Sequence, residues 1–190
     1  CSSDLKLDQE MVQLQKRRGG VGLDLSFIRP TGSPVKNSAI TSTGVVPFME
    51  RYSNSTKEVA QDGRRGALME SISIKHPDAE KFIDAKLTEG KVTGANVSIK
   101  LHDDFMRTAL NDNNNDYLQS YPIDLENVSL DQIDKYDEII TVTNNEGDSV
   151  GYIKKIDAKR IWNKIIHNAW KSAEPGVLFW DKIISESIPD

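Results

Sequence analysis

Three short segments of the chain alternate apolar with small or polar residues, and helical patterns separate them. The segments are VGLDLSFI (21–28), LMESISI (68–74) and ANVSIKL (95–101). Alternation with a period of two is typical of a β-strand that is buried on one face. Strands that alternate with helices across short connections form βαβ units, whose strands pair in parallel. The sequence therefore predicts an α/β fold built on a parallel sheet.

Two helices are predicted around the first of these strands. Apolar spacing of three and four residues indicates a helix over 7–18 that buries Met11 and Leu14 on one face. The stretch 42–61 is interpreted as a second helix, in which Pro47 is tolerated only because it lies near the first turn.

The helical pattern recurs after the second and third strands. A helix is expected to begin at His76-Pro77, because proline suits the first helical position. The most regular pattern covers 157–173, with Asp157 as its N-cap. A fourth strand is predicted over 177–183. The apolar face expected for the 157–173 helix comprises Ala158, Ile161, Trp162, Ile165, Ile166, Ala169 and Trp170.

The segment 111–156 differs in character from the chain on either side of it. It opens with a polar loop, NDNNND (111–116), and 138–156 has the pattern of a β-hairpin that turns at 144–147. We interpret the segment as a loop and hairpin insertion within one partial domain that spans residues 1–190.

Composition narrows the function classes. Lys and Arg number 24 against 29 Asp and Glu, a net charge of −5, which argues against nucleic-acid binding. Cys1 is the only cysteine, so an internal disulfide or a paired-cysteine metal site is excluded. The three histidines lie far apart and predict no metal site. No apolar run approaches the roughly 18 residues of a membrane span, and the expected location is the cytoplasm.

Two glycine-containing loops carry basic residues next to predicted strands, QDGRRGA (61–67) and IRPTGSPVK (28–36). Backbone amides near glycines, together with Arg or Lys, suit phosphate oxygens at the ends of parallel strands. Neither loop has the GxGxxG or Walker A pattern, so dinucleotide binding and a P-loop are not predicted. The alternative interpretation is a pair of solvated surface turns.

Two other groups of residues are interpreted as structural. The carboxylates Asp103 and Asp104, and the pair Glu174 and Asp181, suit helix capping and surface solvation better than acid–base chemistry. The three tryptophans are expected in the core rather than on a stacking platform. These are Trp162, Trp170 and Trp180.

Five ordered blocks of the sequence resemble the large catalytic subunit of ribonucleotide reductase. They are RRGGVGLDLSFIRPTGSPV, STGVVPFMERYSNSTKEVAQDGRRGALM, HPDAEKFIDAK, TGANVSIKLHDDFM and AWKSAEPGVLFWDKI. The amino-acid sequences of these blocks are most similar to those of the adenosylcobalamin-dependent class. The resemblance implies a ten-stranded α/β barrel made of two five-stranded halves, of which this chain would supply most of the first half, with parallel βαβ units and an inserted β-hairpin.

The resemblance also implies site residues. The 61–67 segment matches the loop that lies between an allosteric deoxynucleotide at a dimer interface and the substrate base, and glycines let such a loop change shape. The 28–36 segment matches a loop that binds the effector phosphates. The implied effector-binding residues are Arg29, Lys36, Gln61 and Arg64, and the implied substrate-binding residues are Gly19, Gly20 and Arg65.

The same resemblance implies which catalytic residues this chain lacks and which cofactor and partners the complete enzyme needs. The family's thiyl-radical cysteine and redox pair have no match here, so no catalytic residue is predicted and the isolated chain is expected to be inactive. In the complete enzyme, adenosylcobalamin would bind outside these residues, with ATP or deoxynucleotides as effectors. The expected partners are a ribonucleotide substrate, the remaining half of the catalytic chain and a second copy in a homodimer. The product would be deoxyribonucleotides for DNA synthesis.

Two questions stay open at the level of sequence. Cys1 is either the first redox cysteine or a residue left by a chain start or an intein junction. The alternative to a reductase fragment is a stand-alone regulatory module that binds nucleotides without radical chemistry.

Overall fold

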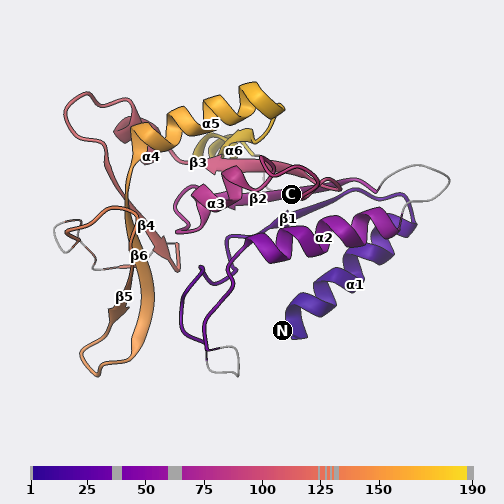
Figure 1. The fold of residues 1–190 in the computed structure, drawn as a ribbon, viewed down its shortest axis with the longest axis horizontal. Coiled ribbons are helices and arrows are strands. Elements are labelled where there is room, and N and C mark those ends of the chain that lie inside the picture. Colours follow the sequence, from indigo (N-terminus) through magenta and orange to yellow (C-terminus); the bar gives the residue numbers. More distant parts are fainter. Residues whose placement is uncertain are drawn as a thin grey trace.

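The computed structural model describes residues 2–35, 40–59, 66–123, 125–126, 128, 130 and 133–187, with side chains from Leu5 onward. Within these ranges the chain forms two sheets and six helices (Figure 1). One sheet is parallel and the other is antiparallel, and they are built from different parts of the chain.

The parallel sheet contains β1 (Val21–Asp24), β2 (Leu68–Ser73), β3 (Asn96–Leu101) and β7 (Gly176–Phe179). Its order is β1-β2-β3-β7, and each neighbouring pair is parallel. The predicted α/β fold with a parallel sheet is therefore confirmed. The described strands do not close into a barrel, so the ten-stranded barrel stays a prediction.

Two predicted strands are shorter than expected. The 21–28 segment stops at Asp24, because the Asp24 carboxylate accepts hydrogen bonds from the N–H and hydroxyl of Ser26 and turns the chain. Phe27 is consequently 80% exposed. The 177–183 segment is strand only to Phe179, where α6 (Trp180–Glu186) begins.

Five of the described helices bury one face each. They are α1 (Ser2–Lys16), α2 (Val46–Glu58), α3 (Ala79–Asp84), α4 (Asp103–Ala109) and α5 (Ala158–Ser172), and α1 lies beside α2 (Figure 1). Their apolar side chains share one core with alternate residues of the strands. The core includes Met11, Met49, Tyr52, Phe82, Ile72, Ile99 and Ile161.

Two predicted helix faces are too wide. On α1, Met11 is buried but Leu14 is 53% exposed, because Gln15 occupies the buried strip instead and bonds to Thr56. On α5, Trp170 is 82% exposed, so the expectation that it lies in the core is wrong. The buried strip of α5 is narrower and consists of Ala158, Ile161, Ile165 and Asn168. The predicted N-cap is confirmed, since Asp157 accepts the Arg160 N–H.

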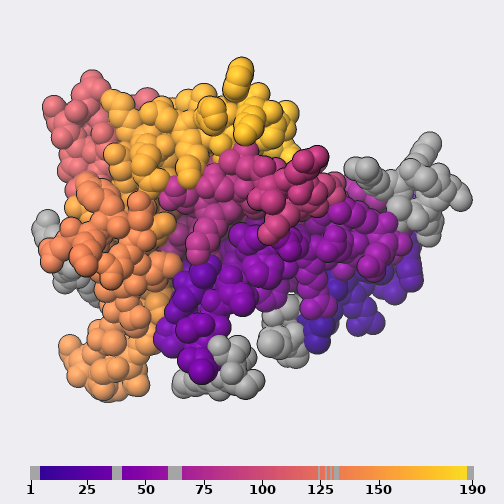
Figure 2. Space-filling view, viewed as in Figure 1, coloured from indigo at the N-terminus to yellow at the C-terminus, as the bar shows by residue number. Residues whose placement is uncertain are grey.

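The antiparallel sheet contains β4 (Asp116–Tyr121), β5 (Ile139–Thr143) and β6 (Ser149–Asp157), in the order β4-β6-β5. The hairpin predicted over 138–156 is present as β5 and β6, and its tip, in orange, projects from the rest of the molecule (Figure 2). The sequence pattern does not predict β4, because the strand begins inside the polar run 111–116, which is typical of a loop.

A cluster of charged side chains joins α3 to α5. The Glu80 carboxylate accepts hydrogen bonds from Arg160 Nη1 at 2.6 Å and from Lys164 Nζ at 2.7 Å. Arg160 also contacts Asp137, and Lys164 contacts Asp84, each at 2.8 Å. Burial alone would raise the pKa of Glu80, but the hydrogen bonds from Arg160 and Lys164 outweigh it and lower the pKa to about 2.

We expect Glu80→Gln to lower the free energy of unfolding by about 1–2 kcal/mol at pH 7, discounted for partial exposure. The pKa of Glu80 is depressed on folding, so its stabilisation is present above the unfolded value near 4.5 and is lost as the pH falls toward 2. Urea unfolding at pH 7 and at pH 2.5 measures this difference. The exposed Glu10→Gln serves as the control, and a gap between variant and parent that is equal at both pH values would contradict the assignment.

Candidate nucleotide site

Gly19 and Gly20 lie where α1 ends and β1 begins, beside the start of β2. The Gly19 N–H donates to the Leu14 carbonyl at 3.0 Å, and the Val21 N–H donates to the Ala67 carbonyl at 2.9 Å. A Cβ added to Gly19 would lie 3.1 Å from the Leu14 oxygen, so the backbones approach closely here. The glycine pair is thus held next to Ala67, where the QDGRRGA segment joins β2.

Four of the predicted site residues lie outside the described part of the chain. They are Lys36, Gln61, Arg64 and Arg65. Only the flanks of the second loop are described. Gly66 lies so close to Gln15 and Thr56 that an added Cβ would come within 3.2 Å of both side chains. The roles of these four residues therefore remain predictions.

The first basic loop doubles back on itself after β1. The Gly32 N–H donates to the Ser42 carbonyl at 2.9 Å, and the Ser42 N–H donates to the Ser33 carbonyl at 2.8 Å. The Val35 N–H donates to the Ile40 carbonyl at 2.8 Å. We call residues 29–45 the hairpin loop, because these bonds pair its two arms.

Arg29 is built into this hairpin loop but remains exposed. Its Nη1 donates to the Pro34 carbonyl at 2.7 Å, and its own carbonyl accepts from the Ser42 hydroxyl at 3.0 Å. A guanidinium has five N–H donors in a rigid fork, so donors remain for an anion. The geometry suits a phosphate-binding arginine with a fixed stem.

The two predicted loops join the sheet at opposite ends. Gly20 and Gly66 precede β1 and β2, whereas the hairpin loop follows the carboxyl end of β1. Because β1 and β2 run parallel, the described ends of the two loops do not meet within one chain. The structure brings Gly19 and Gly20 together with the flank of 61–65, but not with Arg29.

A charged pair lies at the carboxyl end of the parallel sheet, where β1 and β3 finish. Lys100 Nζ contacts the Asp24 carboxylate at 2.5 Å and lies 4.5 Å from the centre of the Trp180 ring. The Lys100 side chain is only 6% exposed, so its charge is balanced inside the protein. The alternation in the sequence indicates a polar face on each strand, but it cannot show that Lys100 contacts Asp24, 76 residues away.

Ser73, His102 and Asp181 are linked by hydrogen bonds in the way that a catalytic triad is, but their role is structural. Asp181 Oδ1 accepts from His102 Nδ1 at 2.8 Å, which leaves Nε2 to accept the Ser73 hydroxyl at 3.1 Å. Ser73 is 1% exposed, and its oxygen also accepts the Lys75 N–H. A substrate carbonyl therefore cannot reach it.

The predicted capping role of the carboxylates is realised by Asp181. Its Oδ2 accepts the Asp103 N–H at the start of α4. That backbone bond, aided by His102, lowers the pKa of Asp181 despite some desolvation. Glu174 accepts the Val97 N–H and forms an ion pair with Lys86. Neither carboxylate is free for acid–base chemistry.

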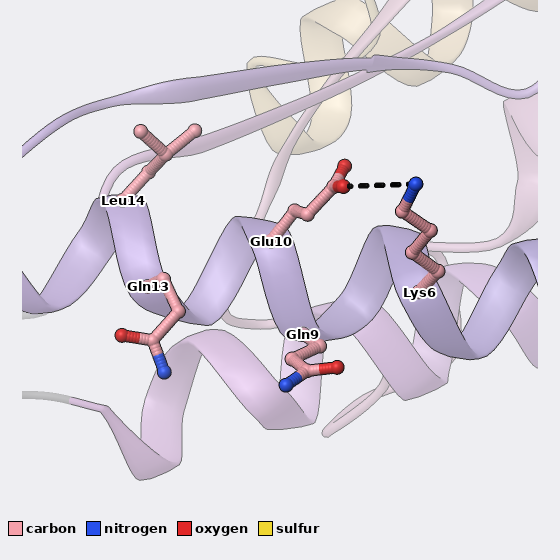
Figure 3. Close-up of a pocket in the computed structure, with 5 residues that line it drawn as sticks. All are labelled: Lys6, Gln9, Glu10, Gln13 and Leu14. Atoms are coloured by element: carbon pink, nitrogen blue, oxygen red, sulfur yellow. Dashed lines mark ion pairs between the residues drawn. The ribbon is translucent and has the colours of Figure 1, made fainter.

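An open hollow on the surface of α1 carries no comparable chemistry. It is lined by Lys6, Gln9, Glu10, Gln13 and Leu14, which all come from one helix (Figure 3). Lys6 and Glu10 form an exposed ion pair at 3.7 Å. Across the described ranges, no three His, Cys, Asp or Glu side chains are grouped to hold a metal ion. In the same part of the chain, no helix could cross a bilayer.

A parallel sheet with glycine-rich connections at both ends places the chain among α/β proteins. The family model for the ribonucleotide reductase barrel domain matches residues 5–188. The chain therefore belongs to the ribonucleotide reductase barrel-domain family.

Curated relatives agree with this family. A vitamin B12-dependent ribonucleoside-diphosphate reductase of Thermoplasma acidophilum is 34% identical over 172 residues, which cover 90% of this chain and 19% of the relative. Ribonucleoside-diphosphate reductase large chain 2 of Saccharomyces cerevisiae is 28% identical, over 91% of this chain and 20% of the relative. The chain thus spans about a fifth of the length of these relatives.

Proposed function

We propose that this chain acts within a ribonucleotide reductase catalytic subunit as the part of the barrel that carries the effector loops and one wall of the substrate site. Arg29 and Lys36 would bind effector phosphates. Gln61 and Arg64 would sense the effector base, and Arg65 would contact the substrate. The single observation that carries this proposal is the placement of Gly19 and Gly20 against the flank of the 61–65 segment.

That placement gives the loop a physical means of acting on the substrate. In the proposal, Gly19 and Gly20 approach the substrate ribose without side chains in between. Ala67, at the end of the 61–67 segment, lies beside Gly20, so in the proposal a change in the shape of that segment alters the space next to the ribose. An effector would select the substrate by stabilising one shape of this segment.

The opposite placement of the two loops supports a homodimer. An effector that contacts both loops needs them closer together than the described ends of the loops lie in one chain, and a second copy of the chain would supply the other loop. Leu7 is 38% exposed and Leu14 is 53% exposed, and both lie on one face of α1, which offers an apolar surface for such a pairing.

The radical chemistry is assigned to other parts of the enzyme. No described histidine is placed in a pocket that would hold a corrinoid: His76 and His102 already use both ring nitrogens, and His167 lies exposed on α5 beside the Trp170 ring. We place the adenosylcobalamin of the complete enzyme, which would generate the radical, outside residues 1–190. The expected reaction is the reduction of ribonucleotides to deoxyribonucleotides.

The test is the substrate preference of a complete reductase that contains this stretch. We expect Gln61→Ala and Arg64→Ala to abolish the change in product ratio that dTTP and dGTP cause, while basal reduction persists. The matched control is Arg107→Ala on α4. A product ratio that still responds to effectors in both variants would contradict the proposal. A regulatory module would instead bind nucleotide but support no reduction when combined with the remaining catalytic half.

A further inference from the structure

We propose that Asp78 is a positioning residue for the hairpin loop: one buried carboxylate ties both ends of the loop to the connection between β2 and α3. The inference rests on the proposed role of the loop in binding effector phosphates. The sequence alone predicts only that Asp78 lies at the start of a helix.

The carboxylate of Asp78 receives donors from both ends of the loop. Its Oδ2 accepts the Thr31 N–H at 2.8 Å, the Thr31 hydroxyl at 3.0 Å and the Val45 N–H at 3.3 Å. The Asp78 side chain is 1% exposed, so water cannot replace these bonds. One oxygen therefore fixes two positions that lie 14 residues apart along the chain.

The loop approaches this oxygen so closely that only glycine fits between them. Gly44 has a φ of +78°, in the left-handed region. A Cβ at this position would lie 2.3 Å from Asp78 Oδ2 and 2.0 Å from the Thr31 hydroxyl oxygen. The second arm of the loop is thus shaped around the carboxylate.

The same connection holds the chain that leads into the loop. His76 Nδ1 accepts the Asp78 N–H at 3.0 Å, so its Nε2 carries the proton and donates to the Ile28 carbonyl at 2.7 Å. From the antiparallel sheet, the Tyr121 hydroxyl donates to the Phe27 carbonyl at 2.8 Å. Residues on both sides of Arg29 are therefore held in place.

Charge supports a carboxylate at this position. Lys81 Nζ lies 3.8 Å from Oδ1, the second oxygen of Asp78. Three donors and one ammonium group therefore face the carboxylate. Because the stem is fixed, Arg29 presents its guanidinium from one place, and less conformational freedom is lost when a triphosphate binds.

The test measures the loop itself and nucleotide binding separately, on the 190-residue chain. In Asp78→Ala, we expect amide hydrogen exchange at Thr31 and Val45 to become at least tenfold faster, while exchange at Ile72 and Ile99 is unchanged. The dissociation constant for dTTP should rise at least tenfold. Asp78→Asn keeps an accepting oxygen of the same reach and should restore most of the protection and the affinity.

The outcomes separate the two proposals. Unchanged exchange at Thr31 and Val45, or an equal loss of protection across the whole sheet, would overturn the role of Asp78. Absence of dTTP binding by the parent chain would count against the proposed function, while the exchange data would still decide the role of Asp78. If Asp78→Ala does not fold, Gly44→Ala should accelerate exchange at the same two amides. Asp112→Ala, at an exposed carboxylate, is the control.

Discussion

Replacing Glu70 with methionine is expected to raise the free energy of unfolding by about 3 kcal/mol at pH 7. Glu70 lies in β2 with no exposed surface, and neither carboxylate oxygen has a hydrogen-bond partner among the described residues. Burial raises the pKa of Glu70 to about 8, although the positive charge of Lys86 opposes the rise. At pH 7 the folded chain must therefore hold a proton that the unfolded chain releases.

The pH dependence follows from the direction of this shift. Between the unfolded pKa near 4.5 and the folded value of about 8, the folded state binds the extra proton, so stability falls as the pH rises. The slope contributed by Glu70 is about 1.4 kcal/mol per pH unit, and Glu70→Met should remove it. Urea unfolding at pH 5, 7 and 8.5 measures both effects. Glu89→Met at an exposed site is the control, and a variant less stable than the parent at pH 8.5 would refute the expectation.

Truncating Phe105 to alanine is expected to lower the free energy of unfolding by about 3–5 kcal/mol. Phe105 is fully buried on α4, and its ring meets Tyr117 of β4 edge-on, with centroids 5.2 Å apart. The Tyr117 hydroxyl also donates to the Asp104 carboxylate at 3.1 Å. The cavity would therefore open where the antiparallel sheet joins the rest of the protein.

Chemical unfolding of Phe105→Ala gives the size of the loss, and amide exchange in β4 and β6 gives its location. Leu110→Ala is the matched control, because Leu110 is 67% exposed and lies just beyond the end of α4. The control should change stability by less than about 0.5 kcal/mol. A loss below about 1 kcal/mol for Phe105→Ala would show that the ring does not hold the two sheets together.

The features that could be predicted from sequence are those set by local pattern. Alternation in 68–74 and 95–101 located β2 and β3, and the βαβ order gave their parallel pairing. The N-cap at Asp157 was predictable because its bond spans only three residues. The extent of 21–28 was overestimated because the side chain of Asp24 competes with the strand for the backbone.

The features that could not be predicted depend on contacts across the chain. Asp78 reaches Thr31 across 47 positions, and no local pattern records such a bond. The exposure of Trp170 depends on how wide a strip of α5 is covered by the elements packed against it. The periodicity of the sequence gives the direction of the buried face but not its width. In contrast, the topology does predict that the two loops join the sheet at opposite ends, because one loop precedes a parallel strand and the other follows one.

The most direct test of the central claim is the thermal midpoint of the purified chain with dTTP, dATP or dGTP, compared with ATP. A ligand that binds only the folded state stabilises it by about 2.7 kcal/mol at one hundred times its dissociation constant, which is a rise of about 5–10 °C for a chain of this size. The account predicts such a rise with deoxynucleotides and its loss in Arg29→Ala, but not in Arg107→Ala. A folded chain whose midpoint does not move, or moves equally in Arg29→Ala, would contradict the claim that the hairpin loop binds the effector.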